Sequence, residues 1–427
     1  MQMKQLTLFE TKHKFNYTLG KNNLTPVEVS FRDIIPEITD TSYLTHSIYY
    51  YPAKFIPQVV RFCINEFTQK GDIILDPFAG SGTVGLEALI TERNAILLDL
   101  NYLLEVIAPI KFYKDQNKID KTILYKKIEQ IKSEKEQFIP DYSNIKYWYP
   151  DDFFEVISRY WAGVHKLNDD IYKWIIKASL LRVSKLFSWA EHRTPKLFKS
   201  KFKKKYIDDL LKINWQKELD NKLIALSYKY HDSVRELQNK VKNFTNNIEY
   251  FAGVDSSKFK LNKNVDALIT SPPYLQAQEY IRTAKLDLYW LGYSDKQIKA
   301  ISKLEIPYRK AERIIHTDTL DNIRKQVSNK KLLNILNSYF DHTIASLENN
   351  MSLLKTGGKA CIFVGNPKID GIEIETWRIF YEYFIVRGFK FEIVFDDEIK
   401  TRQLFGQRNN KNPNGMKSEY LLILSKE

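Results

Sequence analysis

The chain has 427 residues, enough for one large α/β domain with an added module or for two domains of ordinary size. Lysine and arginine (65) outnumber aspartate and glutamate (52), and the formal charge of +13 favours a polyanionic partner, although a lysine-rich composition alone would give the same excess. With two cysteines, seven scattered histidines, no secretory signal and no apolar run of membrane-spanning length, we expect a cytoplasmic protein without disulfides, metal or membrane contact.

The first 44 residues are mostly polar and irregular, and we expect an N-terminal extension there. One apolar cluster, Gln5-Leu6-Thr7-Leu8-Phe9, stands out from it. Further along, the apolar run from Asp72 to Leu75 precedes Asp76-Pro77-Phe78-Ala79-Gly80-Ser81-Gly82-Thr83 and a helix-compatible stretch to Thr91. A second apolar run, Ala95–Leu98, ends at Asp99 and is again followed by a helical pattern. Two successive β-α units predict a parallel, doubly wound sheet.

A long helical and polar segment then interrupts the strand pattern. Residues 111–247 have few strand signals, and strands are expected again at 248–251, 265–270, 359–364, 390–394 and 420–424. The sequence therefore predicts an α/β fold in which residues 45–110 and 248–427 form one domain and residues 111–247 form a helical insert.

The glycine-rich turn is suited to a ligand that lies against the end of a parallel strand. Gly80 and Gly82 leave the turn without side chains, and the following helix offers free N–H groups. Asp99, at the end of the next strand, is placed to accept hydrogen bonds from both hydroxyls of a ribose. The turn is neither a phosphate-binding P-loop nor a dinucleotide fingerprint, because the lysine and the three-glycine spacing are missing.

The tetrapeptide Ser271-Pro272-Pro273-Tyr274 follows directly on a predicted buried strand. Two prolines cannot continue the sheet, so they hold the flanking serine and tyrosine at the strand end. The Ser271 hydroxyl and the Pro272 carbonyl can accept hydrogen bonds from an amino group, which localises the lone pair of its nitrogen. Tyr274 can stack on a base that has left the duplex. The plain structural alternative is a proline turn that only ends the strand.

Both motifs resemble those of the DNA methyltransferases that modify exocyclic amino groups, the cytosine-N4 and adenine-N6 family of restriction–modification systems. The resemblance implies a Rossmann-like class I methyltransferase sheet, S-adenosylmethionine as cofactor and double-stranded DNA as substrate. Serine at the first position of the tetrapeptide is similar to the cytosine-N4 members, so N4-methylcytosine is the preferred product and N6-methyladenine the alternative. The resemblance also implies the cofactor-binding residues Tyr51, Pro52, Lys54, Phe55, Asp76, Pro77, Phe78, Gly80, Gly82, Thr83, Asp99 and Asp255, and the catalytic residues Ser271, Pro272, Pro273 and Tyr274.

Basic residues in two segments are candidates for contact with DNA phosphates. They are Lys199, Lys201, Lys203, Lys204 and Lys205 in the insert and Arg282 and Lys285 after the tetrapeptide. The insert is thus expected to act as a target-recognition region, although it begins earlier in the chain than the resemblance predicts, and Arg402–Lys417 is a second candidate. In the helix that follows the tetrapeptide, Leu286, Leu288 and Trp290 form the expected packing face.

Other functions remain open or are disfavoured by missing residues. A C5-cytosine methyltransferase needs a reactive thiolate, whereas Cys63 and Cys361 lie in apolar patterns typical of core residues, and a zinc deaminase needs ligand spacing that is absent. An inactive nucleic-acid-binding relative, or an enzyme that methylates RNA or a protein glutamine, remains an alternative. Gln5–Phe9 resembles the peptide by which bacterial DNA-processing enzymes dock on the sliding clamp, with an apolar tether as the alternative, and a cognate restriction endonuclease is a further candidate partner.

Overall fold

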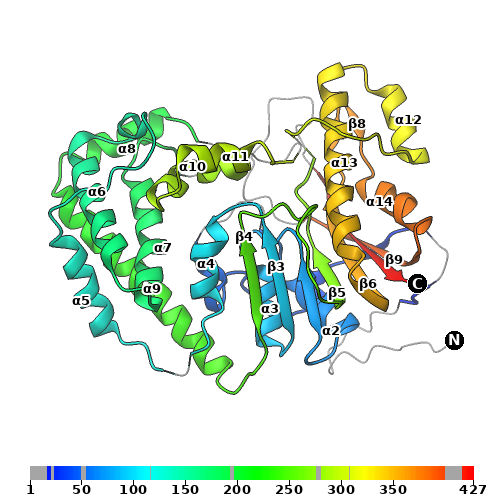
Figure 1. Cartoon of the computed structure of the whole chain (residues 1–427), viewed down its shortest axis with the longest axis horizontal. Helices are drawn as coiled ribbons and strands as arrows, with labels where there is room; N and C mark the ends of the chain where they lie inside the picture. The colour runs from blue at the N-terminus through cyan, green and yellow to red at the C-terminus, as the bar shows by residue number, and fades with distance from the viewer. Residues whose placement is uncertain are drawn as a thin grey trace.

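The computed structural model describes residues 17–20, 24–49, 54–115, 117–192, 197–275, 280–306, 308–399 and 416–427. Its main element is a mixed sheet with the strand order β1-β9-β10-β6-β5-β2-β3-β4 (Figure 1). The strands are β1 (Val27–Val29), β2 (Ile73–Asp76), β3 (Asn94–Asp99), β4 (Ile248–Ala252), β5 (Val265–Thr270), β6 (Leu354–Gly365), β9 (Phe389–Glu398) and β10 (Ser418–Lys426). β10 is antiparallel to β6 and β9, and the other neighbouring pairs of this sheet are parallel. The predicted class, a doubly wound Rossmann-like sheet with a helical insert, is confirmed.

The order of the strands reverses between β2 and β5. From β2 the chain builds outward through β3 to β4, and it then returns to place β5 on the other side of β2. A reversal of this kind leaves a crevice at the carboxyl ends of the two strands, because the connections leave them in opposite directions. β2 ends at Asp76 and β5 ends immediately before Ser271, so the two sequence motifs meet at this point.

Helices cover both faces of the sheet, and alternate strand residues face each layer. Ile74 packs with the helices of one face and Leu75 with those of the other, as expected for a parallel sheet buried on both sides. The first layer contains α1 (Phe31–Ile34), α2 (Pro57–Phe67), α3 (Thr83–Ile90) and α4 (Leu103–Lys111). The second contains α12 (Asp318–Gln326), α13 (Lys330–Met351) and α14 (Thr376–Ile385). Cys63 of α2 and Cys361 of β6 are fully buried between this layer and the sheet, which confirms their prediction as core residues.

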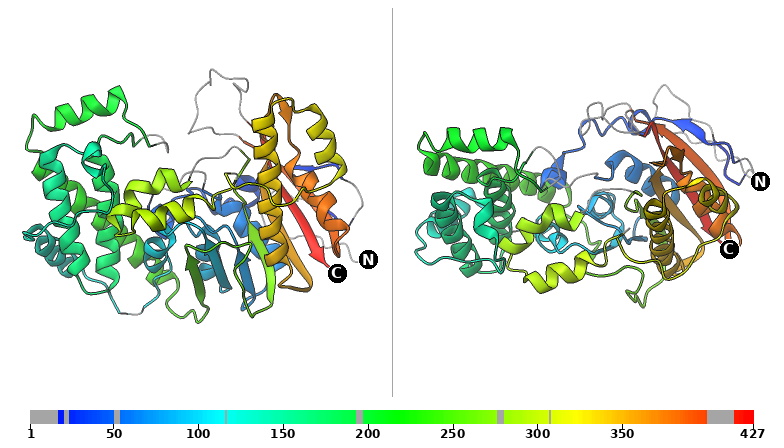
Figure 2. Two further views of the ribbon diagram at one scale, coloured as in Figure 1. Left: turned by 45° about the horizontal axis from the view of Figure 1, so that its top comes forward. Right: turned by 90° about the horizontal axis from the view of Figure 1, so that it is seen from above.

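The helical insert lies between α4 and β4 and stands beside the sheet (Figure 2). Its helices are α5 (Lys121–Lys132), α6 (Asp151–Lys166), α7 (Ile171–Leu186), α8 (Lys201–Leu210) and α9 (Trp215–Lys240). Short elements complete the described chain, namely the 3-10 helices Leu44–Ser47 and Ile145–Trp148 and the small hairpin of β7 (Lys368–Ile369) and β8 (Ile372–Glu373).

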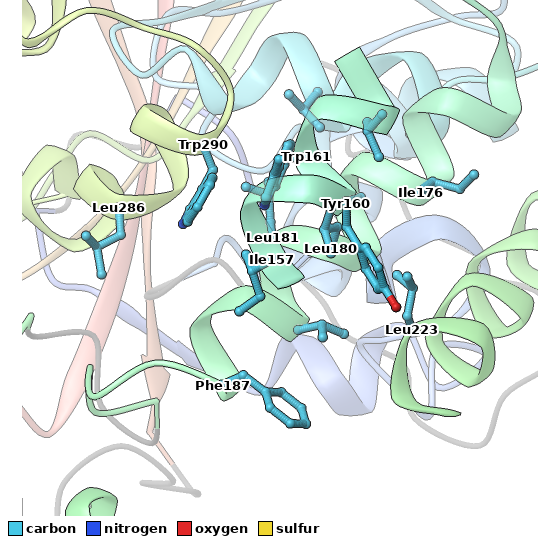
Figure 3. Packing of buried hydrophobic residues seen from close by; sticks show 14 of the residues in the cluster. Ile157, Tyr160, Trp161, Ile176, Leu180, Leu181, Phe187, Leu223, Leu286 and Trp290 are labelled. Atoms are coloured by element: carbon cyan, nitrogen blue, oxygen red, sulfur yellow. The ribbon is translucent and has the colours of Figure 1, made fainter. Parts of the chain in front are cut away.

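The core of this helical module also contains α10 (Tyr280–Trp290) and α11 (Asp295–Ser302), which follow the Ser-Pro-Pro-Tyr motif in the chain. Trp290 is fully buried, its indole N–H donates a 2.7 Å hydrogen bond to the Tyr149 hydroxyl, and its ring stacks on Trp161 with centroids 6.0 Å apart (Figure 3). Leu286 and Leu288 are buried with it, so the predicted packing face of this helix is confirmed. The module is therefore built from two separate parts of the chain.

Part of the segment before residue 45, which was expected to be irregular, belongs to the sheet. Val27, Glu28 and Val29 pair in parallel with residues 395–397 of β9, and Phe31 is fully buried against α2. In the described ranges, no helix is both long and apolar enough to cross a membrane.

Candidate active site

The glycine turn between β2 and α3 takes a conformation that side chains oppose. Gly80 and Gly82 have φ angles of 52° and 73°, in the left-handed region where glycine is favoured. A Cβ atom on Gly82 would also lie 2.8 Å from the Phe112 ring, so this glycine allows α3 to approach its neighbour. Beneath the turn, the buried Lys111 donates a 2.7 Å hydrogen bond from Nζ to the carbonyl of Ser81. Lys111 was not identified from the sequence, because a lysine at the end of an apolar helix gives no local signal of burial.

Asp99 connects the turn to the end of β3. Its Oδ2 accepts a 2.6 Å hydrogen bond from the N–H of Gly80, and its Oδ1 accepts a 2.7 Å bond from the N–H of Asn101. Burial raises the pKa of Asp99 to about 6, and the two backbone donors oppose this rise. Each carboxylate oxygen has a second lone pair, which leaves acceptor capacity for a ligand.

Asp76 connects the end of β2 to the end of β5. Its Oδ1 accepts a 2.7 Å hydrogen bond from Thr270 Oγ1 and a 3.1 Å bond from the N–H of Phe78. Asp76 is buried, and this burial raises its pKa to about 7. Because Thr270 directly precedes Ser271, the carboxyl group of Asp76 ties the glycine turn to the Ser-Pro-Pro-Tyr motif.

A cavity of about 970 Å³, including its opening to solvent, lies at the crevice between β2 and β5. Ser271 from the tetrapeptide lines it together with Asp99 and the glycine turn, which brings both motifs to one space. The residues expected from the sequence that line it are Lys54, Phe55, Asp76, Pro77, Phe78, Gly80, Thr83, Asp99, Asp255, Ser271 and Pro273. Gly82, Pro272 and Tyr274 are described but do not line it, and Tyr51 and Pro52 lie outside the described residues.

Two polar atoms in the cavity wall fit the expected cofactor. Thr83 Oγ1 and Asn101 Nδ2 are buried and have no hydrogen-bond partner among the described residues. Buried polar groups are normally paired, so these atoms favour a polar ligand in the cavity. Together with the acceptor oxygens of Asp99, they suit a nucleoside such as the adenosine of S-adenosylmethionine.

Lys54 and Phe55 reach the cavity from the segment before α2. Lys54 Nζ donates hydrogen bonds to the carbonyls of His46 (2.7 Å) and Thr41 (3.3 Å), and burial lowers its pKa to about 8. The Phe55 ring stacks on Phe363 of β6, with centroids 5.5 Å apart. The segment that precedes α2 is thereby fixed against the sheet beside the glycine turn.

Asp255, expected from the resemblance to bind the cofactor, is already engaged within the protein. Its Oδ1 accepts hydrogen bonds from Ser257, and its Oδ2 forms a 3.0 Å ion pair with Arg309. Arg309, Glu305 and His342 also line the cavity, and they were not identified from the sequence because they follow no recognisable motif. The Glu305 carboxylate accepts a 3.0 Å hydrogen bond from the N–H of Ile281, at the start of α10.

Tyr274 is held on the side of β10. Its hydroxyl donates a 2.6 Å hydrogen bond to Glu419 Oε1. Burial raises the pKa of the phenol well above its ordinary value, and the neighbouring Glu419 carboxylate raises it further. The hydrogen bond therefore holds the ring at its hydroxyl end. Glu419 was not identified from the sequence.

The basic residues expected to contact DNA differ in exposure. Lys199, Lys201, Lys204, Lys205 and Arg282 are exposed, and Lys285 is half-buried with its Nζ 4.7 Å from the centre of the Tyr142 ring. Lys199 also lies over an aromatic ring, 3.4 Å from the centre of Tyr147.

The prediction that Lys203 contacts DNA was wrong. Lys203 is fully buried, its Nζ donates a 2.6 Å hydrogen bond to the carbonyl of Leu186, and burial lowers its pKa to about 7. Its ammonium group is turned into the protein, where it cannot meet a phosphate. Lys203 therefore has a structural role in holding α8 on α7.

Comparison with known proteins agrees with this site. The family of DNA methylases of the N6/N4 type matches residues 9–108, which contain the glycine turn and Asp99. The type II methyltransferase M.BsoBI of Geobacillus stearothermophilus is 25% identical over 385 residues, or 76% of this chain and 75% of the relative. The type II methyltransferase M.MvaI of Kocuria varians is 24% identical over 433 residues, or 90% and 92% of the two chains.

Among solved structures, TrmN from Thermus thermophilus matches 87% of this chain and 49% of its own, with a TM-score of 0.30 and 9% identity. The strand order defines the fold, because a TM-score of 0.30 is too low to do so. The family match covers the cofactor motif, and both type II relatives extend along three quarters or more of the chain. The family match and these relatives support an exocyclic-amino (N6/N4) DNA methyltransferase of restriction–modification type, with S-adenosylmethionine as methyl donor.

Proposed function

We propose that this protein methylates the exocyclic amino group of a specific base in double-stranded DNA, with N4-methylcytosine as the product. The observation that carries the proposal is the cavity at the β2–β5 crevice, because Ser271 and Pro273 line it together with the glycine turn and Asp99. A methyl donor on one side and an amino group on the other would then meet at the ends of two adjacent strands.

Residues of the glycine turn and β3 would hold the cofactor, whose sulfonium supplies the methyl group when it is bound. Asp99 would accept hydrogen bonds from the ribose hydroxyls, and Thr83 and Asn101 would satisfy their unpaired buried atoms on the same ligand. The chain's contribution here is to fix the ligand and to exclude water.

The tetrapeptide would act on the base. Ser271 Oγ and the Pro272 carbonyl would accept hydrogen bonds from the two amino hydrogens, which localises the nitrogen lone pair that the ring otherwise delocalises. A base stacked within a duplex cannot reach a crevice at the strand ends, so the target base must leave the helix. Tyr274 would stack on the extruded base.

The helical module is our candidate for the DNA-binding part. Lys201, Lys204 and Lys205 are exposed on α8, which lies at the end of the module toward which the parallel strands point (Figure 1). With Lys199, Arg282 and Lys285 they would meet DNA phosphates on the side of the cavity opening. Gln5–Phe9, which we propose as a sliding-clamp peptide, lies outside the described residues. A cognate restriction endonuclease is a further proposed partner.

The choice of cytosine over adenine rests on Ser271, since this serine resembles the cytosine-N4 members of the family. The test is expression in a host without DNA methyltransferases, followed by digestion of its DNA to nucleosides and mass spectrometry. We expect N4-methylcytosine from the wild type and none from Ser271→Ala. N6-methyladenine would change the product but keep the enzyme class, whereas no modified base from a protein that binds S-adenosylmethionine and DNA would identify an inactive relative.

A further inference from the structure

The ring of Tyr274 lies close to Gly365 at the end of β6. Its hydroxyl donates to Glu419 on β10, and Glu419 is the residue paired with Gly365 at the end of β6. One strand pair thus supplies both the acceptor for the hydroxyl and the glycine beside the ring.

A side chain at Gly365 would crowd its neighbours. A Cβ atom on Gly365 would overlap the sulfur of Met416 and lie 3.2 Å from Cε2 of Tyr274. Gly365 is not among the glycines with positive φ, so its backbone would accept a side chain and the limit is the neighbouring atoms. The close approach of the Tyr274 ring to β6 depends on this residue.

The hydrogen bond between Tyr274 and Glu419 joins two partly buried groups. Burial raises the pKa of the Glu419 carboxyl group, and the hydrogen bond from Tyr274 opposes that rise. A carboxyl group in such surroundings is costly unless it is hydrogen-bonded, and the phenol supplies the bond.

We propose that Glu419 is a positioning residue for methyl transfer, which acts by holding the Tyr274 ring in place against Gly365. A tyrosine side chain loses conformational entropy when its ring stacks on an extruded base. A ring that is already held by a hydrogen bond at its hydroxyl loses less entropy on stacking. This inference rests on the proposed role of Tyr274. It assigns a role in methyl transfer to a residue of β10 that lies 145 positions after Tyr274 in the chain.

The test compares Glu419→Ala, Glu419→Gln, Tyr274→Phe and the double variant Glu419→Ala/Tyr274→Phe. The rate of single-turnover methyl transfer from S-adenosylmethionine is measured on unmethylated genomic DNA, with cofactor affinity and melting temperature measured alongside. Glu398→Ala is the matched control, because Glu398 is an exposed carboxylate on the adjacent strand β9.

We expect Glu419→Ala and Tyr274→Phe each to slow methyl transfer about tenfold, the size of one missing hydrogen bond to a charged group. The double variant should be no slower than the slower single variant, because both changes break one interaction. Glu419→Gln keeps an acceptor oxygen and should retain the rate within about threefold. Cofactor affinity should be unchanged in all of these variants and in the control.

Two results would overturn the inference. A wild-type rate in Glu419→Ala, or effects that multiply in the double variant, would mean that Glu419 does not act through Tyr274. If Glu419→Ala fails to fold, a wild-type rate in Tyr274→Phe, which lacks the same hydrogen bond, would lead to the same conclusion. A wild-type rate in Tyr274→Ala would instead remove the proposed role of the tyrosine itself, which separates failure of the proposed function from failure of this inference.

Discussion

Replacing Asp99 tests whether the end of β3 holds the cofactor. In the structure its two carboxylate oxygens accept hydrogen bonds from the N–H groups of Gly80 and Asn101, and each oxygen keeps one lone pair for a ligand. A hydrogen bond to a charged group contributes about 1.5–3 kcal/mol, so removing two ribose hydrogen bonds costs at least about 3 kcal/mol. Asp99→Ala should therefore weaken S-adenosylmethionine binding about a hundredfold or more.

Calorimetric titration with S-adenosylmethionine and with S-adenosylhomocysteine measures this loss, which should be equal for both because they share the ribose. Asp99→Asn keeps one acceptor oxygen and should lose about tenfold. Tyr274→Phe serves as the control with unchanged affinity, since Tyr274 does not line the cavity. A folded Asp99→Ala protein that binds within about threefold of the wild type would refute the assignment of this carboxylate to the ribose.

Two further predictions concern pH and salt. Ribose hydroxyls donate to the ionised form of Asp99, whose pKa burial raises to about 6, so cofactor affinity should fall as pH drops through 6. At pH 5 it should be about tenfold weaker than at pH 7.5, a decline that Asp99→Asn should flatten. Changing Lys201, Lys204 and Lys205 to alanine should reduce the slope of log DNA affinity against log salt by about one unit for each phosphate that is no longer neutralised. Lys203→Ala should leave that slope unchanged and lower the melting temperature, because the amine of Lys203 is internal.

The meeting of the two motifs could be predicted because it depends on strand polarity alone. Asp76, Asp99 and Ser271 each follow a short apolar run, and the carboxyl ends of parallel strands share one edge of the sheet. The residues that complete the cavity could not be predicted in this way. Arg309 and Glu305 come from an irregular segment after α11, and only the folded chain shows that they approach β4 and α10.

The error at Lys203 has a physical cause in the helical period. A run of lysines indicates an exposed face, but in a helix the residues three and four apart share a side. Lys203, Ile207 and Leu210 follow that spacing, and all three are buried. The helical period therefore places Lys203 on the buried side of α8 and Lys204 and Lys205 on the exposed side. The run of lysines in the sequence does not make this distinction.

The position of the insert explains how a large module can remain aligned with the active site. It enters the fold in the connection from α4 to β4, at the edge of the sheet, where a crossover is required in any case. A module joined there alone would pivot about its two chain connections. Packing opposes such a motion, because α4 contributes residues to the module's core and α10, which starts six residues after Tyr274, ends in the same core at Trp290. If the module binds DNA as proposed, α10 would help to hold that DNA in register with the tetrapeptide, because the stacking of Trp290 on Trp161 fixes the end of this helix in the module's core.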